Sequence, residues 1–367
     1  MAQVVQRLSG AGAVAARGAT RRRTSWREDL VTAGLSAWMI AGGASDGWAH
    51  VHAKPDTFLT PWHAAIYSGF AALFAWMIWL SHPARGGVPV GYGLGLAGGV
   101  VLLAGSVGDG VWHTVFGIEL SFEALLSPTH ILLFAGAMLL VATPARAAWG
   151  SRWPSAAPTL RDFAPTLLSL TVTTCTLIVF LGHASAFGRL AATRAVSPAA
   201  PLDTPPYHVI EQGFMDIQFT NLVLLGVLLL ALRRWRLPFG SATVLFVVPV
   251  ATSVVIWEAT NAWLVLAALA GGLVADWCLA RSSGPAVGRR THLLVATATP
   301  LALWSSYFLV LHLQHGITWS AELWTGSLLF TLLGGYALHL LMLPPLAPQT
   351  AEQRPTAGSG RTRPDTQ

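Results

Sequence analysis

Two groups of aspartate and histidine residues carry the types and the spacing that could do chemistry in this chain. Each group consists of an aspartate, a histidine four residues later and a second histidine further along: Asp46, His50 and His63 in the first, and Asp109, His113 and His130 in the second. In a helix, residues four apart lie on the same face, so each aspartate should lie beside its first histidine. One carboxylate with two imidazoles is a compact set of oxygen and nitrogen ligands, of the kind that non-haem iron, copper and zinc sites use.

The second histidine of each group follows a proline that is expected to begin a helix. Pro61 precedes His63 by two residues, and Pro128 precedes His130 in the same way. Because proline is favoured in the first turn of a helix, each of these histidines should lie near the start of a helix that packs back against the one carrying its aspartate. The sequence therefore predicts two three-ligand metal sites, each built by a helical hairpin.

The two groups belong to a tandem repeat. About eleven positions match in order between the copies. In both copies a glycine stands four residues before the aspartate and another stands six residues after the second histidine: Gly42 and Gly69 in the first, Gly105 and Gly136 in the second. Since the repeat unit is a pair of helices, both copies should point the same way, related by an axis along the membrane normal.

A weaker echo of the pattern occurs later in the chain, where His183, His208 and Glu211 are further candidate ligands. A structural interpretation stands beside the metal one for every group. Each aspartate could accept a hydrogen bond from the histidine one turn away, while the later histidine caps its helix. Duplication of the whole triad favours metal binding, because packing alone does not require the same three ligand types twice.

The elements that must position these residues are membrane-spanning helices. Of the 367 residues, 53% are hydrophobic and 10% are charged, with a mean hydropathy of +0.56, which argues against a soluble protein. An apolar stretch of about 20 residues crosses the ~30 Å hydrocarbon core as a helix. Ten such stretches are predicted, at residues 30–49, 62–81, 89–112, 124–143, 163–184, 209–232, 240–258, 261–280, 293–313 and 322–343. The predicted fold is an all-α, polytopic membrane helix bundle.

The placement of the charges predicts the topology. With ten helices and a cytoplasmic N-terminus, 19 of the 22 basic residues fall on the cytoplasmic side, and only Lys54, Arg189 and Arg194 do not. This bias follows the positive-inside rule and places both termini in the cytoplasm. The net charge of +6 is then topological, so nucleic acid is not expected as a partner. Nine of the twelve histidines fall outside, as do acidic residues that include Asp56, Glu119, Asp203 and Glu258.

Four segments follow from this topology: a basic cytoplasmic tail over residues 1–28, the tandem repeat over 29–146, six further helices over 147–346 and a disordered cytoplasmic tail over 347–367. Cys175 and Cys278 lie in different spans, so neither a disulfide nor a thiolate metal site is expected. Arginine outnumbers lysine 21 to 1, and alanine and glycine are abundant. This usage is typical of a high-GC bacterial genome, which would make the membrane a bacterial plasma membrane, with the metal motifs facing outside.

A few polar residues lie inside the later spans, namely Asp216, Gln218, Asn221 and Asp276. They could line a route for an ion or could pair between helices, and the sequence does not separate these two roles. No esterase nucleophile elbow, HExxH zinc motif or phosphate-binding loop occurs.

The first triad is an Asp-x-x-x-His motif followed, after twelve intervening residues, by a histidine. This spacing resembles the metal motif in the C subunit of the copper membrane monooxygenases, the particulate methane and ammonia enzymes. That subunit carries a second, similar motif on a later helix pair, as Asp109, His113 and His130 would here. The resemblance covers residues 35–140. It implies that the six residues are copper ligands near a membrane-embedded oxidation site, with other membrane subunits as partners.

Several functions fit these residues. A membrane oxidoreductase with a redox metal, copper first and iron or zinc as alternatives, would need an open coordination position at the metal. A metal uptake or delivery protein would need a polar route inward. A zinc-dependent lipid hydrolase would use the same ligands to activate water, and a non-enzymatic membrane scaffold would not use them chemically.

Overall fold

The chain forms a helical bundle. The structure is a computed structural model that describes residues 22–54, 60–117, 123–151, 155–195, 205–257, 259–282, 284 and 286–343. Within these residues all regular structure is helical and no strand occurs, which confirms the all-α prediction. The predicted tails lie outside the described residues, except for residues 22–28, and so do Asp56, Glu119, Asp203 and Glu258.

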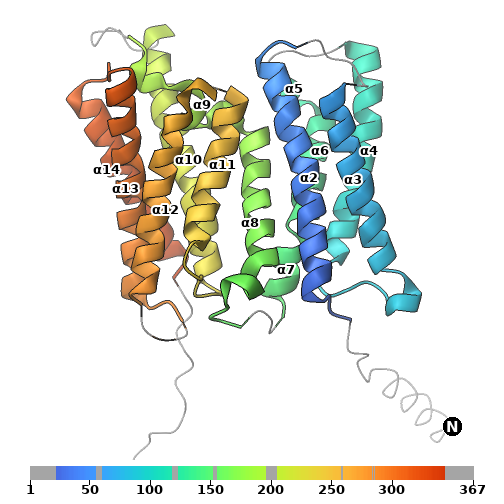
Figure 1. Cartoon of the computed structure of the whole chain (residues 1–367). Coiled ribbons are helices and arrows are strands. Elements are labelled where there is room, and N and C mark those ends of the chain that lie inside the picture. Colours follow the sequence, from blue (N-terminus) through green and yellow to red (C-terminus); the bar gives the residue numbers. More distant parts are fainter. Residues whose placement is uncertain are drawn as a thin grey trace, which may run out of the picture.

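Thirteen α-helices run through the described residues, and most stand side by side across one slab (Figure 1). The long ones are α2 (Trp26–Val51), α3 (Pro61–Leu80), α4 (Gly93–Phe116), α6 (Pro128–Val141), α8 (Leu160–Phe180), α10 (Pro205–Leu232), α11 (Ser241–Trp257), α12 (Val265–Ala280), α13 (Arg289–Gln314) and α14 (Ala321–Leu341). The short ones are α5 (Glu123–Leu126), α7 (Thr143–Trp149) and α9 (Ala186–Arg189). Four 3-10 turns join them, at η1 (Pro83–Arg85), η2 (Gly182–Ala184), η3 (Ala191–Thr193) and η4 (Ala259–Leu264).

Each of the ten predicted spans overlaps one of the long helices, with ends that differ by up to four residues. Seven helices in the described part are long and apolar enough to cross a membrane, namely α3, α4, α8, α10, α12 with the end of η4, α13 and α14. The pair α6 and α7, bent by 45°, makes an eighth if it is one span. Helix α11 is apolar but has 17 residues, and α2 is long but is not among the helices that qualify by composition. Both stand alongside the others in the bundle (Figure 1).

Two separate groups of buried apolar side chains hold the bundle together. One lies among α2, α3, α4, α6 and α8, around residues such as Leu73, Met77 and Leu140. The other lies among α8 and α10 to α14, around Phe187, Trp235 and Trp304. Helix α8 packs against both α2 and α11, and so joins the two parts.

Glycines let the helices of the first part approach closely. A Cβ atom added to Gly69 on α3 would lie 2.7 Å from the Cα atom of Met39 on α2. A Cβ atom added to Gly136 on α6 would lie 2.5 Å from the backbone nitrogen of Leu102 on α4. No side chain fits in either place, so these glycines set the separation of the two helices in each hairpin.

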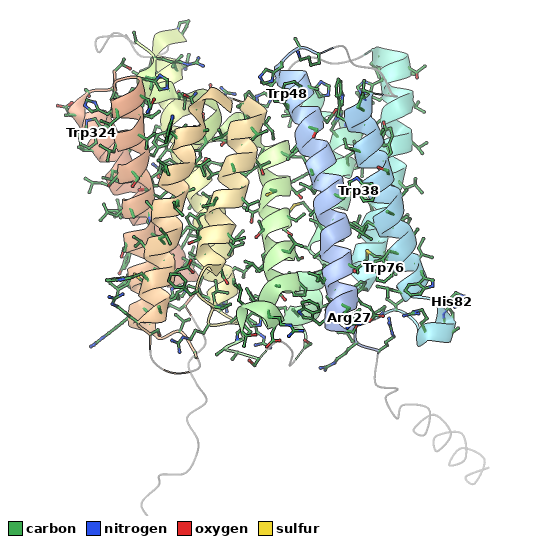
Figure 2. All side chains as sticks on the ribbon, in the orientation of Figure 1. Arg27, Trp38, Trp48, Trp76, His82 and Trp324 are labelled. Carbon is green, nitrogen blue, oxygen red and sulfur yellow. The ribbon has the colours of Figure 1, made fainter. Side chains whose placement is uncertain are left out.

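The opposite ends of the bundle differ in their side chains. Figure 2 shows Trp48 and Trp324 at one end and Arg27 and His82 at the other. Arg22 and Arg85 lie at the second end too, where both pair with Glu28. Arg85 also stacks on the ring of Trp79, with its Cζ atom 3.7 Å from the ring centre. The predicted cytoplasmic and outer residues are therefore separated by the length of the bundle.

Candidate metal centres

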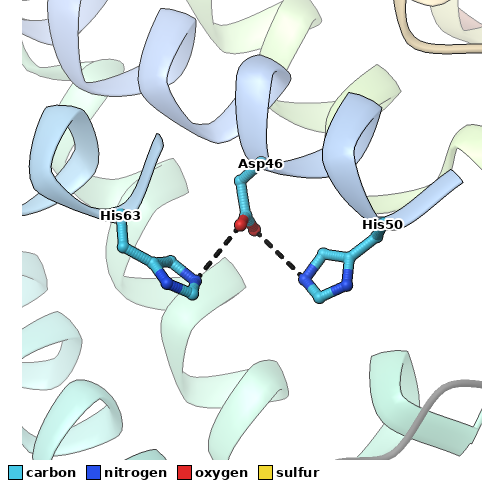
Figure 3. A group of neighbouring side chains, drawn as sticks. All are labelled: Asp46, His50 and His63. Carbon is cyan, nitrogen blue, oxygen red and sulfur yellow. Dashed lines mark ion pairs between the residues drawn. The ribbon is translucent and has the colours of Figure 1, made fainter. Parts of the chain in front are cut away.

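The first triad converges at one end of the α2–α3 hairpin. Asp46 points between the two imidazoles, which come from both helices (Figure 3). His63 Nε2 lies 3.1 Å from Asp46 Oδ1, and His50 Nε2 lies 3.6 Å from Asp46 Oδ2. One ligand atom from each of the three residues can be chosen so that all lie within 4.8 Å of one another, a spacing that suits a shared metal ion.

Local sequence explains why His63 is available to the group. Thr60 caps the start of α3 in extended conformation and Pro61 occupies the first helical position, so His63 falls in the first turn. The Thr60 hydroxyl lies 3.0 Å from His63 Nδ1 and holds that side of the ring. The other ring nitrogen, Nε2, is thereby turned toward Asp46.

The second triad is built in the same way by α4 and α6. His113 Nε2 lies 3.3 Å from Asp109 Oδ2, and His130 Nδ1 lies 3.3 Å from Asp109 Oδ1. These three residues also offer ligand atoms within 4.8 Å of one another. In the part of the chain that the structure describes, the two triads are the only groups of three such residues. The convergence of both predicted triads is therefore confirmed.

Neighbouring polar groups orient the ligands of the second triad. Thr129 donates a hydrogen bond of 2.8 Å to Asp109 Oδ1, and the Ser127 hydroxyl lies 2.9 Å from His130 Nδ1. His113 Nδ1 lies 3.1 Å from the backbone oxygen of Gly117. Partners of this kind fix the rotamers and ring tautomers of metal ligands.

The bond to Gly117 is informative because a carbonyl oxygen can only accept. His113 Nδ1 must therefore carry the hydrogen, and in the neutral ring Nε2 then presents a lone pair. That lone pair faces a carboxylate oxygen of Asp109 at 3.3 Å. Two acceptors at this distance require a cation between or beside them, which is either a second ring proton or a metal ion.

The first triad has a related feature. Asp46 Oδ1 is buried and receives no hydrogen bond, although His63 Nε2 lies 3.1 Å away. A buried carboxylate oxygen without a donor is costly unless a positive charge compensates it. The donor set fits a metal ion of the nitrogen and oxygen class, and the competing interpretation is an ion pair between aspartate and a protonated imidazole.

The third predicted group does not assemble. His208 Nδ1 and Glu211 Oε2 lie 3.4 Å apart on an exposed face of α10, whereas His183 lies against Arg189 and Trp257. Arg189 Nη2 is 3.4 Å from His183 Nδ1, one of the two ring nitrogens that could bind a metal. Burial, and secondly the charge of Arg189, hold the pKa of His183 below its usual value. A guanidinium donor at a ligand atom disfavours a metal ion there.

The reason is the path of the segment that contains His183. Residues 182–194 fold into the end of the second part of the bundle, with Phe187 fully buried against Trp304 and Tyr307. The Tyr307 hydroxyl donates to the backbone oxygen of Ala186. No hairpin spacing in the sequence signals such an inward fold.

Most of the polar residues inside the later spans form bonds between helices. Asn221 donates to the backbone oxygen of Thr331 and accepts from the indole of Trp304, and Gln218 donates to the backbone oxygen of Ser327. Asp276 accepts two backbone N–H groups and a hydroxyl at the start of α11. Asp216 alone among the four keeps a buried oxygen without a hydrogen-bond partner. These bonds favour pairing between helices over a continuous polar route.

The supporting residues Thr60, Ser127, Thr129 and Gly117 were not identified from the sequence. The signal for two of them was present, because both copies carry a hydroxyl residue, proline, one further residue and then histidine, at 60–63 and 127–130. A hydroxyl at such a cap position reaches the third residue of the helix. Thr129 and Gly117 have no equivalent in the first copy, so only the structure identifies them as supporting residues.

Comparison of the chain with known protein families, with curated proteins and with solved structures finds no match.

Proposed function

We propose that this chain is a membrane metalloprotein of ten spanning helices, with one metal ion in each of its two leading hairpins at the outer membrane face. The observation that carries the proposal is the duplicated convergence of one carboxylate and two imidazoles, each group with ligand atoms within 4.8 Å of one another. One such group at a helix end could be a hydrogen-bonded pair with a neighbour. Two groups with the same three residue types in the same arrangement favour metal binding over chance packing.

Equivalent backbone contacts support the tandem repeat. An added Cβ atom on Gly42 would meet the backbone nitrogen of Ile66 at 2.6 Å, and one on Gly105 would meet that of Leu133 at 3.0 Å. Gly42 and Gly105 stand four residues before their aspartates, and Ile66 and Leu133 stand three residues after their second histidines. The two hairpins thus use the same close contact one turn below the ligands.

The sidedness rests on charge. Arg27 and Asp46 lie near opposite ends of α2, and Trp48, two residues after Asp46, lies at the end of the bundle opposite Arg27 (Figure 2). The basic residues predicted to be cytoplasmic follow the positive-inside bias. We place the triads at the outer face of a plasma membrane, with both termini inside. The lipid bilayer is then the main partner, and other membrane subunits would be further partners within it.

The ligand set favours copper, with iron and zinc as alternatives. Imidazole suits all three metals, and copper binds most tightly to a given nitrogen and oxygen site. The motif spacing that the first triad shares with copper membrane monooxygenases points the same way. A metal ion with three protein ligands keeps open positions, where it supplies redox or Lewis-acid chemistry. We therefore favour an oxidoreductase-type membrane subunit over an uptake protein. An uptake protein would need a polar route for the ion, and most polar residues of the later helices are instead hydrogen-bonded between helices.

Metal content of the purified full-length protein tests the proposal. Wild type should carry two metal ions per chain, each of the single variants Asp46→Ala and Asp109→Ala should carry one, and the double variant should carry none. His52→Ala is the matched control, because His52 is exposed and its Nδ1 atom contacts the backbone of Trp48 instead of a triad. Equal metal content in wild type and the double variant would refute the metal sites.

The redox part of the proposal has a separate readout. Bound copper or iron should give an electron paramagnetic resonance signal that changes on reduction with dithionite. Two stoichiometric zinc ions in protein produced with copper and iron supplied would keep the metal sites but overturn the oxidoreductase assignment.

A further inference from the structure

The two triads have the same ligand types but different surroundings, and we infer that they bind metal with different affinities and serve different roles. The Asp109 triad is a retentive centre that fills first and holds its metal. The Asp46 triad is the exchange centre, where a divalent metal ion enters from and returns to the outer solution. This inference rests on the proposed function, since it requires that both triads bind metal.

The first difference concerns the aspartate. Thr129 donates to Asp109 Oδ1 at 2.8 Å and so fixes the orientation of that carboxylate before any metal arrives. The residue at the same place in the first copy, immediately before the second histidine, is Trp62. Its indole nitrogen is buried without a partner, and Asp46 Oδ1 receives no hydrogen bond. The carboxylate of the first triad is therefore held less firmly.

The second difference concerns the first histidine. The ring of His113 is held at Nδ1 by the Gly117 carbonyl, which directs Nε2 at Asp109. The side chain of His113 is 21% exposed, whereas that of His50 is 42% exposed. His50 also lies farther from its aspartate, at 3.6 Å against 3.3 Å. Water and competing ligands can reach His50 more readily.

The third ligand does not follow this trend, since His63 is 18% exposed and His130 is 23% exposed. Each ring has a hydroxyl at its Nδ1 atom, from Thr60 and Ser127 respectively. His63 faces its aspartate with the other nitrogen, Nε2, whereas His130 faces Asp109 with Nδ1 itself. The inference rests on the asymmetry of the aspartate and the first histidine. Loss of one such supporting bond lowers the metal affinity of a site by about 10- to 100-fold.

Cobalt binding to the metal-free, full-length protein tests the inference. Asp46→Ala leaves only the Asp109 triad, and Asp109→Ala leaves only the Asp46 triad, so titration with Co²⁺ alone measures each centre separately by its visible absorption. We expect the Asp109 triad to have a Kd about 10- to 100-fold lower. We also expect excess EDTA to remove cobalt from wild type in two phases, of which only the fast phase is lost in Asp46→Ala.

Exchange of the supporting residues provides a second, independent arm. Thr129→Val keeps the shape of the side chain but removes the donor, and it should raise the Kd of the Asp109 triad by about 10-fold and speed its release of cobalt. Trp62→Thr should lower the Kd of the Asp46 triad. Trp62→Phe is the control for loss of the indole alone and should leave that Kd unchanged.

The outcomes separate the inference from the proposal beneath it. Absence of saturable cobalt binding in wild type would overturn the metal sites themselves. Two bound ions with equal Kd values and a single release phase, or tighter binding at the Asp46 triad, would overturn the division of roles and leave the metal sites standing. An unchanged Kd in Thr129→Val would show that the hydroxyl does not cause the difference.

Discussion

Asp46 in the first part of the bundle and Asp276 in the second have opposite hydrogen-bond environments. In the hairpins of the first part, Asp46 and Asp109 lie at the helix ends among imidazoles, and Asp46 Oδ1 faces His63 Nε2 at 3.1 Å without accepting a hydrogen bond. In the second part, Asp276 lies within α12 and is saturated by the backbone of Ala242 and Thr243 and by the Thr243 hydroxyl. The hydrogen bonds that the two carboxylates accept therefore distinguish Asp276, which is saturated by its neighbours, from Asp46, which faces imidazole nitrogens.

The strongest test of this contrast is Asp276→Ala. Two backbone N–H groups at the buried start of α11 would lose their acceptor, which should lower the free energy of unfolding by about 3 kcal/mol, at 1 to 3 kcal/mol for each unsatisfied group. Asp46→Ala should change the stability of the metal-free protein by less than about 1 kcal/mol. Unfolding in mild detergent, followed by tryptophan fluorescence, measures both. Equal destabilisation by the two variants would remove the distinction between them.

A glycine variant sharpens the contrast between hairpin geometry and the rest of the bundle. Gly136→Ala would place a methyl group 2.5 Å from the backbone of Leu102, which should force α4 and α6 apart and cost about 2 kcal/mol. The Asp109 triad should lose its metal, while the Asp46 triad keeps its own. Gly226→Ala is the matched control, since nothing lies within 4 Å of its added Cβ atom. Full metal content in Gly136→Ala would show that the triad tolerates a wider hairpin.

A smaller effect is expected from the bonded polar residues of the second part. Asn221→Leu removes the bonds to Thr331 and Trp304 and should lower stability by about 1 kcal/mol, the usual scale for hydrogen bonds between membrane helices. The metal content should remain two ions per chain. Loss of metal from Asn221→Leu would mean that the two parts of the bundle are coupled, contrary to the comparison above.

The smallest expected effect is a pH dependence from His183. Because its pKa is lowered in the folded protein, the unfolded chain binds a proton more readily, so this contribution to stability is present above the ordinary pKa of about 6.5 and is lost as the pH falls. His183→Phe keeps a ring against Trp257 and should flatten the stability profile between about pH 7 and pH 5. Thermal unfolding across that range compares it with wild type. Identical profiles would exclude His183 as the source.

Hydrophobic stretches were enough to predict the helices, because a bilayer restricts the chain to helices wherever apolar runs are long. The metal triads were predictable because their ligands lie close in sequence within hairpins. Spacing could not reveal which polar atoms would be satisfied. The roles of Asp276 and Thr129 depend on partners that lie 34 and 20 residues away, at Ala242 and Asp109. The inward fold of residues 182–194, which separates His183 from His208, likewise depends on tertiary packing.

The glycine contacts of the hairpins have a mechanical consequence. Each triad draws its residues from two helices that touch backbone to backbone at Gly69 or Gly136, so an ion bound at the triad would hold the same pair of helices as the glycine, at a different height. A lateral force on the hairpin within the bilayer, from lipid thickness or a neighbouring subunit, would pivot the helices about the glycine. If a metal ion is bound, such a force would change the distances between the ion and its ligands.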